Sequence, residues 1–189
     1  LHNECGHVHH HLGLSAFATH TVVDRRSAVK VDKDIPAEIA ALFGCAVLTG
    51  AGAVFNSAAM KEGESVLVYG LGGVGLSALL AARAIGASTL VAVDPSAEKR
   101  AIATELGAIA LSPEEVAEKA PTIFPDGGPD LVIETVGRAA VLVAAYQVAR
   151  RGGRVCTVGL PNPAGRFDIN ALSLVAEGKT IIGSYMGSA

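Results

Sequence analysis

A cluster of glycines with the spacing of a phosphate-binding turn follows an apolar run at residues 66–69. The cluster consists of Gly70, Leu71, Gly72, Gly73, Val74 and Gly75. It matches the pattern G-x-G-x-x-G, in which the first glycine permits a tight turn, the second lets a pyrophosphate approach the backbone, and the third lets a helix pack closely against a strand. A helix beginning here would direct free N–H groups and its positive dipole end at phosphates. The loop therefore predicts a dinucleotide site.

An acidic residue stands at the distance that a ribose-binding carboxylate requires. Asp94 follows a second apolar run, residues 90–93, about 20 residues after the glycine loop. Its carboxylate would accept hydrogen bonds from ribose hydroxyls and repel a 2′-phosphate, which favours NAD over NADP. The competing interpretation is an ordinary glycine turn, with Asp94 capping a helix that begins near Pro95. The sequence context favours the dinucleotide site.

Short apolar runs alternate with helical stretches from residue 65 onward, and this rhythm predicts how the glycine loop and the acid are positioned. The expected strands are 66–69, 90–93, 109–111, 131–134, 155–158 and 180–183. The expected helices are 74–85, 97–106, 113–120, 139–151 and 171–177. Runs that are apolar on both faces indicate a parallel sheet covered by helices on both sides. The predicted fold class is α/β, a doubly wound parallel six-stranded Rossmann sheet.

The first 34 residues have a different texture, and five of the six histidines lie within the first eleven. Residues 17–23 and 28–31 read as short strands on either side of a turn. This segment is too short to bury a core, so it resembles the end of a β-rich unit. From Pro36 onward, helical sequence is expected to residue 49 and again to about Met60. The predicted domains are 1–34, a remnant, and 35–189, a Rossmann domain.

Composition excludes several classes of protein. Apolar residues make up 50% of the chain and charged residues 17%, which excludes disorder. A net charge of -3 without a basic run argues against nucleic-acid binding. Three cysteines form no disulfide framework, so a reducing, cytoplasmic location is expected. Residues 39–60 and 65–82 lack charges, but their glycines and polar side chains argue against membrane spans.

With these residues together, the chain resembles the zinc-dependent medium-chain alcohol dehydrogenases. Four stretches carry the resemblance, at residues 43–50, 70–75, 132–137 and 158–161. The arrangement Gly44-Cys45-x-x-x-Thr49-Gly50 is more specific than the glycine loop. The resemblance covers nearly the whole chain and identifies residues 1–34 as the end of a GroES-like catalytic domain.

The resemblance implies roles for individual residues. Cys45 matches a ligand of the catalytic zinc, and Thr49 matches the residue that packs against the nicotinamide. Val74 backs the nicotinamide, Lys99 reaches the adenosine ribose, and Val136 lines the adenine side. The expected nicotinamide and carboxamide contacts are Val158, Gly159, Leu160, Ser184, Tyr185 and Met186.

A catalytic zinc needs three protein ligands, and the resemblance supplies only Cys45 within this sequence. We therefore expect the chain to be a piece of a longer enzyme that, alone, binds no catalytic zinc and turns over no alcohol. The N-terminal cluster of Cys5, His7 and residues 9–11 is interpreted as structural or surface-exposed, with adventitious nickel or zinc binding as the alternative. Two other roles stay open: Glu134 as a buried hydrogen-bonding group or a catalyst, and Arg138 as a cofactor contact or a solvated helix start.

The predicted function is that of the NAD-binding domain of an alcohol dehydrogenase that oxidises alcohols or reduces aldehydes by hydride transfer. Zinc would serve as a Lewis acid in the full-length enzyme. The alternatives are a zinc-free NADPH-dependent medium-chain reductase and a non-catalytic nucleotide-binding module. Residues 180–183 would form an edge strand, through which a homodimer is expected. The sequence does not identify the alcohol or aldehyde.

Overall fold

The computed structural model describes residues 2–3, 6–7 and 18–188. Contacts divide the chain into two compact units, Leu1–Ala40 and Ala41–Ala189, and each unit is described by itself. The domain boundary expected between residues 34 and 35 stays a prediction.

The first unit contains little regular structure in its described residues. Strands β1 (His2–Asn3) and β2 (Gly6–His7) form a short antiparallel pair. Residues 18–23 and 28–31 form no strand, so that prediction is wrong for the described residues; residue 17 and most of the Cys/His cluster lie outside them. The physical reason is exposure: Val22 and Val29 are 94% and 85% exposed, and an alternating pattern becomes a strand only where one face is buried.

A continuous helix runs from Ala37 to Ser57. It comprises α1 (Ala37–Leu42), a π-helical turn η2 (Phe43–Val47), α2 (Leu48–Gly52) and a second π-helical turn η3 (Ala53–Ser57). The break expected near residue 49 is absent. Length and composition alone would let this helix cross a membrane, but residues 49–50 and 52–54 are buried in the second unit. No membrane span is indicated.

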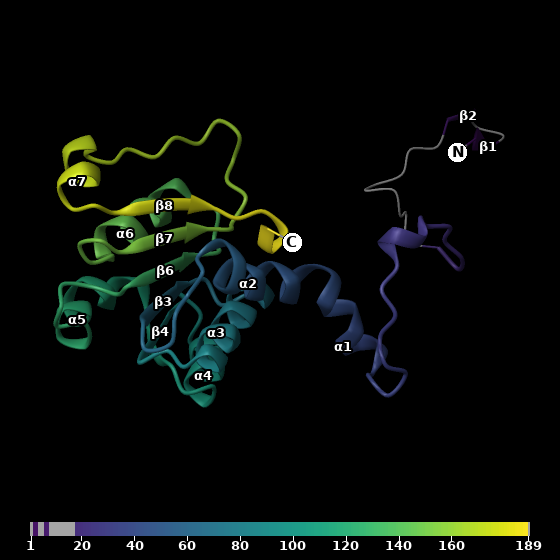
Figure 1. Cartoon of the computed structure of the whole chain (residues 1–189), viewed down its shortest axis with the longest axis horizontal. Helices are drawn as coiled ribbons and strands as arrows, with labels where there is room; N and C mark the ends of the chain where they lie inside the picture. Colours follow the sequence, from purple (N-terminus) through teal and green to yellow (C-terminus); the bar gives the residue numbers. More distant parts are fainter. Residues whose placement is uncertain (1, 4–5, 8–17, 189) are drawn as a thin grey trace. The chain divides into compact units, whose positions relative to one another are not determined.

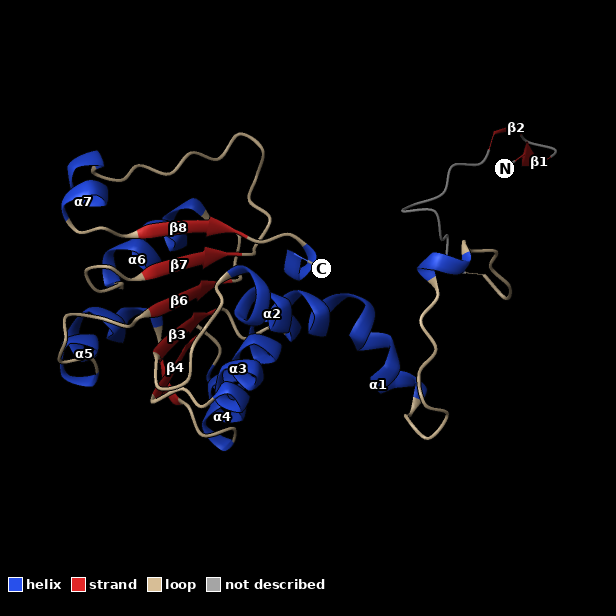
Figure 2. Ribbon diagram, viewed as in Figure 1, coloured by secondary structure: helices blue, strands red, loops and turns tan. Residues whose placement is uncertain are grey.

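Six parallel strands form the sheet of the second unit (Figures 1 and 2). They are β3 (Ser65–Tyr69), β4 (Thr89–Val93), β5 (Ile109–Leu111), β6 (Leu131–Glu134), β7 (Arg154–Thr157) and β8 (Thr180–Gly183). Their order is β5-β4-β3-β6-β7-β8. Successive strands are added toward one edge from β3 to β5, and toward the opposite edge from β6 to β8. This is the strand order of the dinucleotide-binding Rossmann fold, so the predicted fold class is confirmed.

Helices connect successive strands. They are α3 (Gly73–Ile85), α4 (Ala97–Glu105), α5 (Val116–Ile123), α6 (Ala139–Val148) and α7 (Ala171–Ala176), and a 3-10 turn η4 (Pro113–Glu115) precedes α5. Two further 3-10 turns lie outside these connections: η1 (Arg25–Ser27) in the first unit and η5 (Met186–Ser188) after β8. Gly86 ends α3 in the left-handed conformation, with φ of 96°, as expected of a helix-stop glycine. Helix α6 ends at Val148 rather than at residue 151, because Ala149 turns extended and Arg150 is engaged by Asp130.

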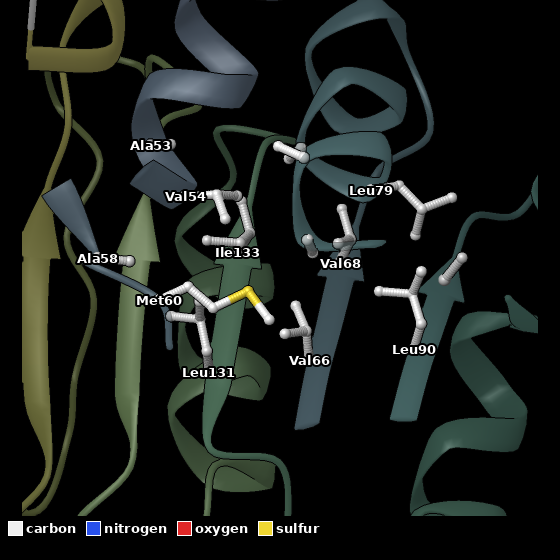
Figure 3. Close-up of a cluster of buried hydrophobic side chains, with 14 of the residues drawn as sticks. Ala53, Val54, Ala58, Met60, Val66, Val68, Leu79, Leu90, Leu131 and Ile133 are labelled. Atoms are coloured by element: carbon white, nitrogen blue, oxygen red, sulfur yellow. The ribbon is translucent and has the colours of Figure 1, made fainter. Parts of the chain in front are cut away.

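Alternating residues of the strands point into two separate cores. One core joins β3, β4 and β6 to α3, α4 and residues 53–60 (Figure 3). The other joins the opposite face of the same strands to α5 and α6. Cys156 of β7 is fully buried in the first core, and burial raises the pKa of its thiol to about 11. The sheet is therefore covered on both sides, as its apolar strands predict.

Ion pairs tie the amino ends of three strands together. The carboxylate of Glu64, just before β3, accepts from both terminal nitrogens of Arg154, at 3.0 and 2.6 Å. Asp130, just before β6, accepts from the backbone and hydroxyl of Ser65, at 2.8 and 2.6 Å, and from Arg150 Nε at 2.7 Å. Burial acts to raise the pKa of both carboxyl groups, but these hydrogen bonds outweigh it and hold each pKa below its ordinary value.

Candidate functional site

The glycine loop follows β3 at the carboxyl edge of the sheet, and each of the three glycines of its G-x-G-x-x-G pattern has a different structural setting. Gly70 has φ of 87°, and a Cβ there would lie 2.7 Å from Thr135 Oγ1. A Cβ on Gly75 would lie 1.8 Å from the carbonyl oxygen of Gly70, so this glycine permits close packing of α3 against its own loop rather than against the strand. A Cβ on Gly72 would meet nothing within 4 Å. The space beside Gly72 is therefore open to a ligand.

Thr135 fixes the loop from the neighbouring strand. It follows β6, and its hydroxyl donates to the carbonyl oxygens of Tyr69 and Gly70, at 2.9 and 3.1 Å. Its backbone N–H also donates to Tyr69, at 3.0 Å. Because β3 and β6 flank the point where the strand order reverses, these bonds hold the loop at the position where doubly wound sheets bind ligands.

Asp94 is buried directly beside the glycine loop, with 5% of its surface exposed. One carboxylate oxygen accepts from the backbone N–H of Leu71 at 2.8 Å, and the other from that of Ser96 at 2.8 Å. Lys99 Nζ lies 3.9 Å from the same carboxylate. The helix that follows is capped by Ser96 rather than by Asp94, so the capping interpretation of Asp94 is wrong. A carboxylate offers about four acceptor sites, which leaves capacity for a ligand.

A cleft of about 840 Å³ contains this loop and acid. The sequence-predicted residues that line it are Gly70, Leu71, Gly72, Gly73, Val74, Gly75, Asp94, Lys99 and Val136. The structure therefore brings the predicted adenosine and pyrophosphate contacts together along the ends of β3, β4 and β6. Tyr69, Pro113 and Ala144 also line this cleft, and sequence reasoning missed them because β3, η4 and α6 meet only in the folded chain.

A second cleft, of about 430 Å³, lies at the carboxyl ends of β6, β7 and β8. The predicted residues that line it are Val158, Gly159, Leu160, Ser184 and Tyr185. The loops that follow β6 and β7 pack closely against each other beside this cleft, because a Cβ on Gly159 would lie 2.1 Å from the backbone nitrogen of Gly137. Arg166 and Phe167 complete the lining, and no motif marks them in the sequence. Arg138, whose role the sequence left open, lines both clefts.

Glu134 is the most buried carboxylate near these clefts, with 1% of its surface exposed. One oxygen accepts from the backbone N–H groups of Val136 and Gly137, each at 2.7 Å. The other accepts from the hydroxyl of Thr157 at 2.7 Å. These bonds tie the loop after β6 to β7. Of the two roles left open by the sequence, a buried hydrogen-bonding group or a catalyst, the structure supports the first.

A family model described as zinc-binding dehydrogenase matches residues 73–189, which is more than half of the chain. The chain belongs to the zinc-binding dehydrogenase family. Geraniol dehydrogenase of Castellaniella defragrans is 41% identical over 172 residues, covering 89% of this chain and 46% of its own length. The fold and sequence together confirm the resemblance to the zinc-dependent medium-chain alcohol dehydrogenases and their coenzyme-binding domain.

Solved structures of zinc-binding dehydrogenases share this architecture. Benzyl alcohol dehydrogenase from Acinetobacter calcoaceticus superposes with a TM-score of 0.86 at 34% identity, over 93% of this chain and 49% of that one. A protein from Sinorhizobium meliloti described as a zinc-binding dehydrogenase, solved with NADP bound, gives a TM-score of 0.78 at 27% identity, over 87% and 49%. The chain spans about half the length of the curated relatives it matches.

The residues that the family resemblance assigns to zinc do not complete a metal site in the described part of this zinc-binding dehydrogenase chain. Cys45 is exposed and free in the π-helical turn η2. No group of three or more His, Cys, Asp or Glu side chains that could hold a metal occurs among residues 2–3, 6–7 and 18–188. One thiol is too few ligands for a catalytic zinc.

Thr49 and Met186, both expected near the nicotinamide, contact each other. Thr49 is 8% exposed, and its hydroxyl lies 3.8 Å from the sulfur of Met186. Close backbone packing holds this arrangement, because a Cβ on Gly52 would lie 2.5 Å from the carbonyl oxygen of Gly187. Cys45 and Thr49 lie four residues apart in the same helix, but Cys45 is exposed and Thr49 is buried. Neither lines the two clefts described above.

Proposed function

We propose that the larger cleft binds the adenosine and pyrophosphate of NAD, and that the chain is the coenzyme-binding part of an NAD-dependent alcohol dehydrogenase. The observation that carries the proposal is the pairing of open backbone at Gly72 with the buried carboxylate of Asp94 in one cleft. A pyrophosphate beside Gly72 would meet the first N–H groups of α3, which have no partner within the helix.

Asp94 would receive the adenosine ribose. Two of its acceptor positions are taken by Leu71 and Ser96, and the remaining capacity suits two ribose hydroxyls. A 2′-phosphate at the same place would bring a second negative charge against a buried carboxylate, which is costly in a low-dielectric site. This supports NAD as the preferred cofactor.

An NADP-linked enzyme is the second candidate, because two cationic side chains lie beside Asp94, one near its carboxylate and one at its backbone. Lys99 Nζ lies 3.9 Å from Asp94, and the guanidinium of Arg100 donates to the carbonyl oxygens of Asp94 and Pro95, at 2.7 and 2.8 Å. The relative from Sinorhizobium meliloti was solved with NADP. Lys99 is 47% exposed at its side chain, so it could turn toward a 2′-phosphate.

The smaller cleft would hold the nicotinamide. The backbone of residues 158–160 would read the carboxamide, and Ser184 and Tyr185 would flank the ring. Thr49, Val74 and Met186 do not line this cleft, and their contact with the ring is proposed from the family resemblance alone. The cofactor supplies hydride acceptance at the nicotinamide, while the chain supplies position and exclusion of water. The names of the geraniol and benzyl alcohol dehydrogenases support primary alcohols and their aldehydes as the substrate class of the whole protein.

Three further proposals concern the whole protein. Cys45 would contribute one ligand to a zinc site completed by residues outside the described set. Strand β8 lies at the edge of the sheet, and two copies paired through it would form a homodimer. A cytoplasmic location is consistent with the unpaired cysteines Cys45 and Cys156.

Calorimetric titration of the chain with NAD and NADP tests the cofactor proposal. We expect NAD to bind at least tenfold more tightly than NADP, and Asp94→Ala to weaken NAD by about tenfold, equivalent to about 1.4 kcal/mol. Asp126→Ala removes an exposed carboxylate remote from both clefts and serves as the control. Unchanged NAD affinity in Asp94→Ala would rule out the proposed ribose contact, and tighter NADP binding would favour the second candidate.

A further inference from the structure

The larger cleft continues into further open space on one side. Beyond Tyr69, Pro113 and Ala144 it adjoins a groove of about 380 Å³, and these three residues line both. Its lining includes Val116, Ala117 and Ala120 of α5 and Val148 of α6; both helices are labelled in Figure 1. We refer to it as the α5–α6 groove.

The chemistry of the α5–α6 groove restricts what it can bind. No charged residue lines it, and most of its walls are small apolar side chains and glycine backbone. Its volume lies within the range of about 300–1,000 Å³ that is usual for small-molecule sites. A charged group such as a phosphate would lose its hydration there without compensation. The groove therefore suits a neutral, flat, apolar group.

Tyr69 places one polar atom at the junction of the cleft and the groove. The residue is only 6% exposed, and burial alone raises the pKa of its hydroxyl to about 12. No residue that the structure describes supplies a hydrogen-bond partner for this hydroxyl. The hydroxyl oxygen is also not fully enclosed by protein atoms. A nearly buried hydroxyl that still faces open space is satisfied when a ligand or water supplies the bond.

The lining of the larger cleft indicates the direction in which an adenine base would extend. If Asp94 holds the ribose, the base can extend toward Pro113, which follows β5, and toward Tyr69, which ends β3, because both residues line the same cleft as Asp94. We propose that the α5–α6 groove accepts an aromatic group carried on the amino edge of an adenine base, with the Tyr69 hydroxyl bonded to that edge, so that the chain binds base-substituted adenine nucleotides. This inference rests on the proposed nucleotide function.

Titration with ADP and with N6-benzyl-ADP tests the groove. We expect the benzyl derivative to bind within threefold of ADP or more tightly, because the benzyl group enters apolar space instead of clashing. A loss of more than threefold would overturn the inference. Failure of ADP itself to bind would instead overturn the proposed function, so the two failures are distinguishable.

Groove-filling variants make the test specific. Ala117→Leu adds bulk from the exposed rim of α5, and we expect it to weaken N6-benzyl-ADP at least fivefold while ADP changes less than twofold. Ala101→Leu makes the same change on an exposed position of α4 outside the groove and should alter neither ligand. Equal affinity of N6-benzyl-ADP for Ala117→Leu and the unchanged chain would place the benzyl group elsewhere and overturn the inference.

Tyr69→Phe tests the contact at the junction. It removes only a hydroxyl that has no described protein partner, so the unfolding midpoint should change little. Loss of one ligand hydrogen bond should weaken ADP by about two- to tenfold. Tyr146→Phe, which removes a hydroxyl bonded to Ser173 at 2.7 Å, is the matched control and should leave ADP affinity unchanged. Unaltered ADP affinity in Tyr69→Phe would overturn the assigned base contact.

Discussion

The two ends of the parallel sheet satisfy their carboxylates by different means. At the amino ends, Glu64 and Asp130 accept from the guanidinium groups of Arg154 and Arg150. At the carboxyl ends, Asp94 and Glu134 accept mainly from backbone N–H groups. Guanidinium pairing neutralises charge and joins strands, whereas backbone donors hold Asp94 and Glu134 in place, and the ion pair of Asp94 with Lys99 is longer, at 3.9 Å. The amino end is therefore built for stability, and the carboxyl end retains charge and open backbone for a ligand.

Glu134 lies at the carboxyl end of the sheet, but we expect it to contribute to stability, as the carboxylates of the amino end do. Glu134→Ala leaves the N–H groups of Val136 and Gly137 and the hydroxyl of Thr157 without their acceptor. Unsatisfied buried donors are expensive, so we expect a loss of about 3–4 kcal/mol in the free energy of unfolding, measured by urea denaturation. Glu134→Gln keeps one oxygen acceptor and should recover about half of this loss. A cost below about 1 kcal/mol would argue against a structural role.

Removing the cation from the amino end should have the next largest effect. Arg154→Ala leaves the carboxylate of Glu64, 16% exposed at its side chain, without its two-pronged partner. We expect a loss of about 2 kcal/mol in unfolding free energy and no change in nucleotide affinity. Arg154→Lys retains the charge without the two-pronged geometry, so its unfolding free energy should lie between those of Arg154→Ala and the unchanged chain. If nucleotide affinity fell as much as stability, the division between the two ends would be wrong.

A methyl group at Gly72 should produce the opposite result, a loss of affinity without a loss of stability. The added Cβ meets no protein atom within 4 Å, but it occupies the space proposed for the pyrophosphate. We expect NAD affinity to fall by about tenfold, or about 1.4 kcal/mol, in a calorimetric titration. Gly44→Ala, another glycine with open space around it, is the control. Undiminished binding in Gly72→Ala would place the pyrophosphate away from this loop.

Mild acid should produce the smallest effect, and it should act at the amino end. The pKa values of Glu64 and Asp130 are held below their ordinary values of 4.5 and 3.8. Stabilisation by a lowered carboxyl pKa is fully present above the ordinary value and is lost as the pH falls through the folded-state value. The unfolding free energy should therefore decrease as the pH falls below about 4.5. Asp130→Asn should make this dependence on pH shallower. An unchanged slope would mean that the Asp130–Arg150 ion pair contributes nothing to the pH dependence.

Features set by local sequence could be predicted, and those set by tertiary contact could not. The glycine loop, Asp94 and the ends of β4 and β6 follow from residues close together in the chain. The helix capped by Ser112 was also predictable, because its capping box lies within four residues. These local signals predict the strands, the helices between them and the place of the larger cleft.

Other features depend on what a segment meets after folding. The alternating pattern of residues 28–31 reads as a strand, yet no partner pairs with it among the described residues. The unpartnered hydroxyl of Tyr69 follows from the meeting of β3 with η4 and α6. Phe167 reaches the smaller cleft from an irregular loop after β7. Periodicity carries no information on such encounters, so sequence reasoning missed these parts of the site.

The contrast between Cys45 and Cys156 offers a practical handle. Thiol alkylation requires the thiolate, and at neutral pH almost none of the Cys156 sulfur is ionised when its pKa is about 11. Cys45 is open to solvent. A fluorescent maleimide should therefore label the helical turn that holds Cys45 and spare the sheet. With Cys5, the third cysteine of the sequence, replaced by serine, such a dye would give this segment an optical signal of its own.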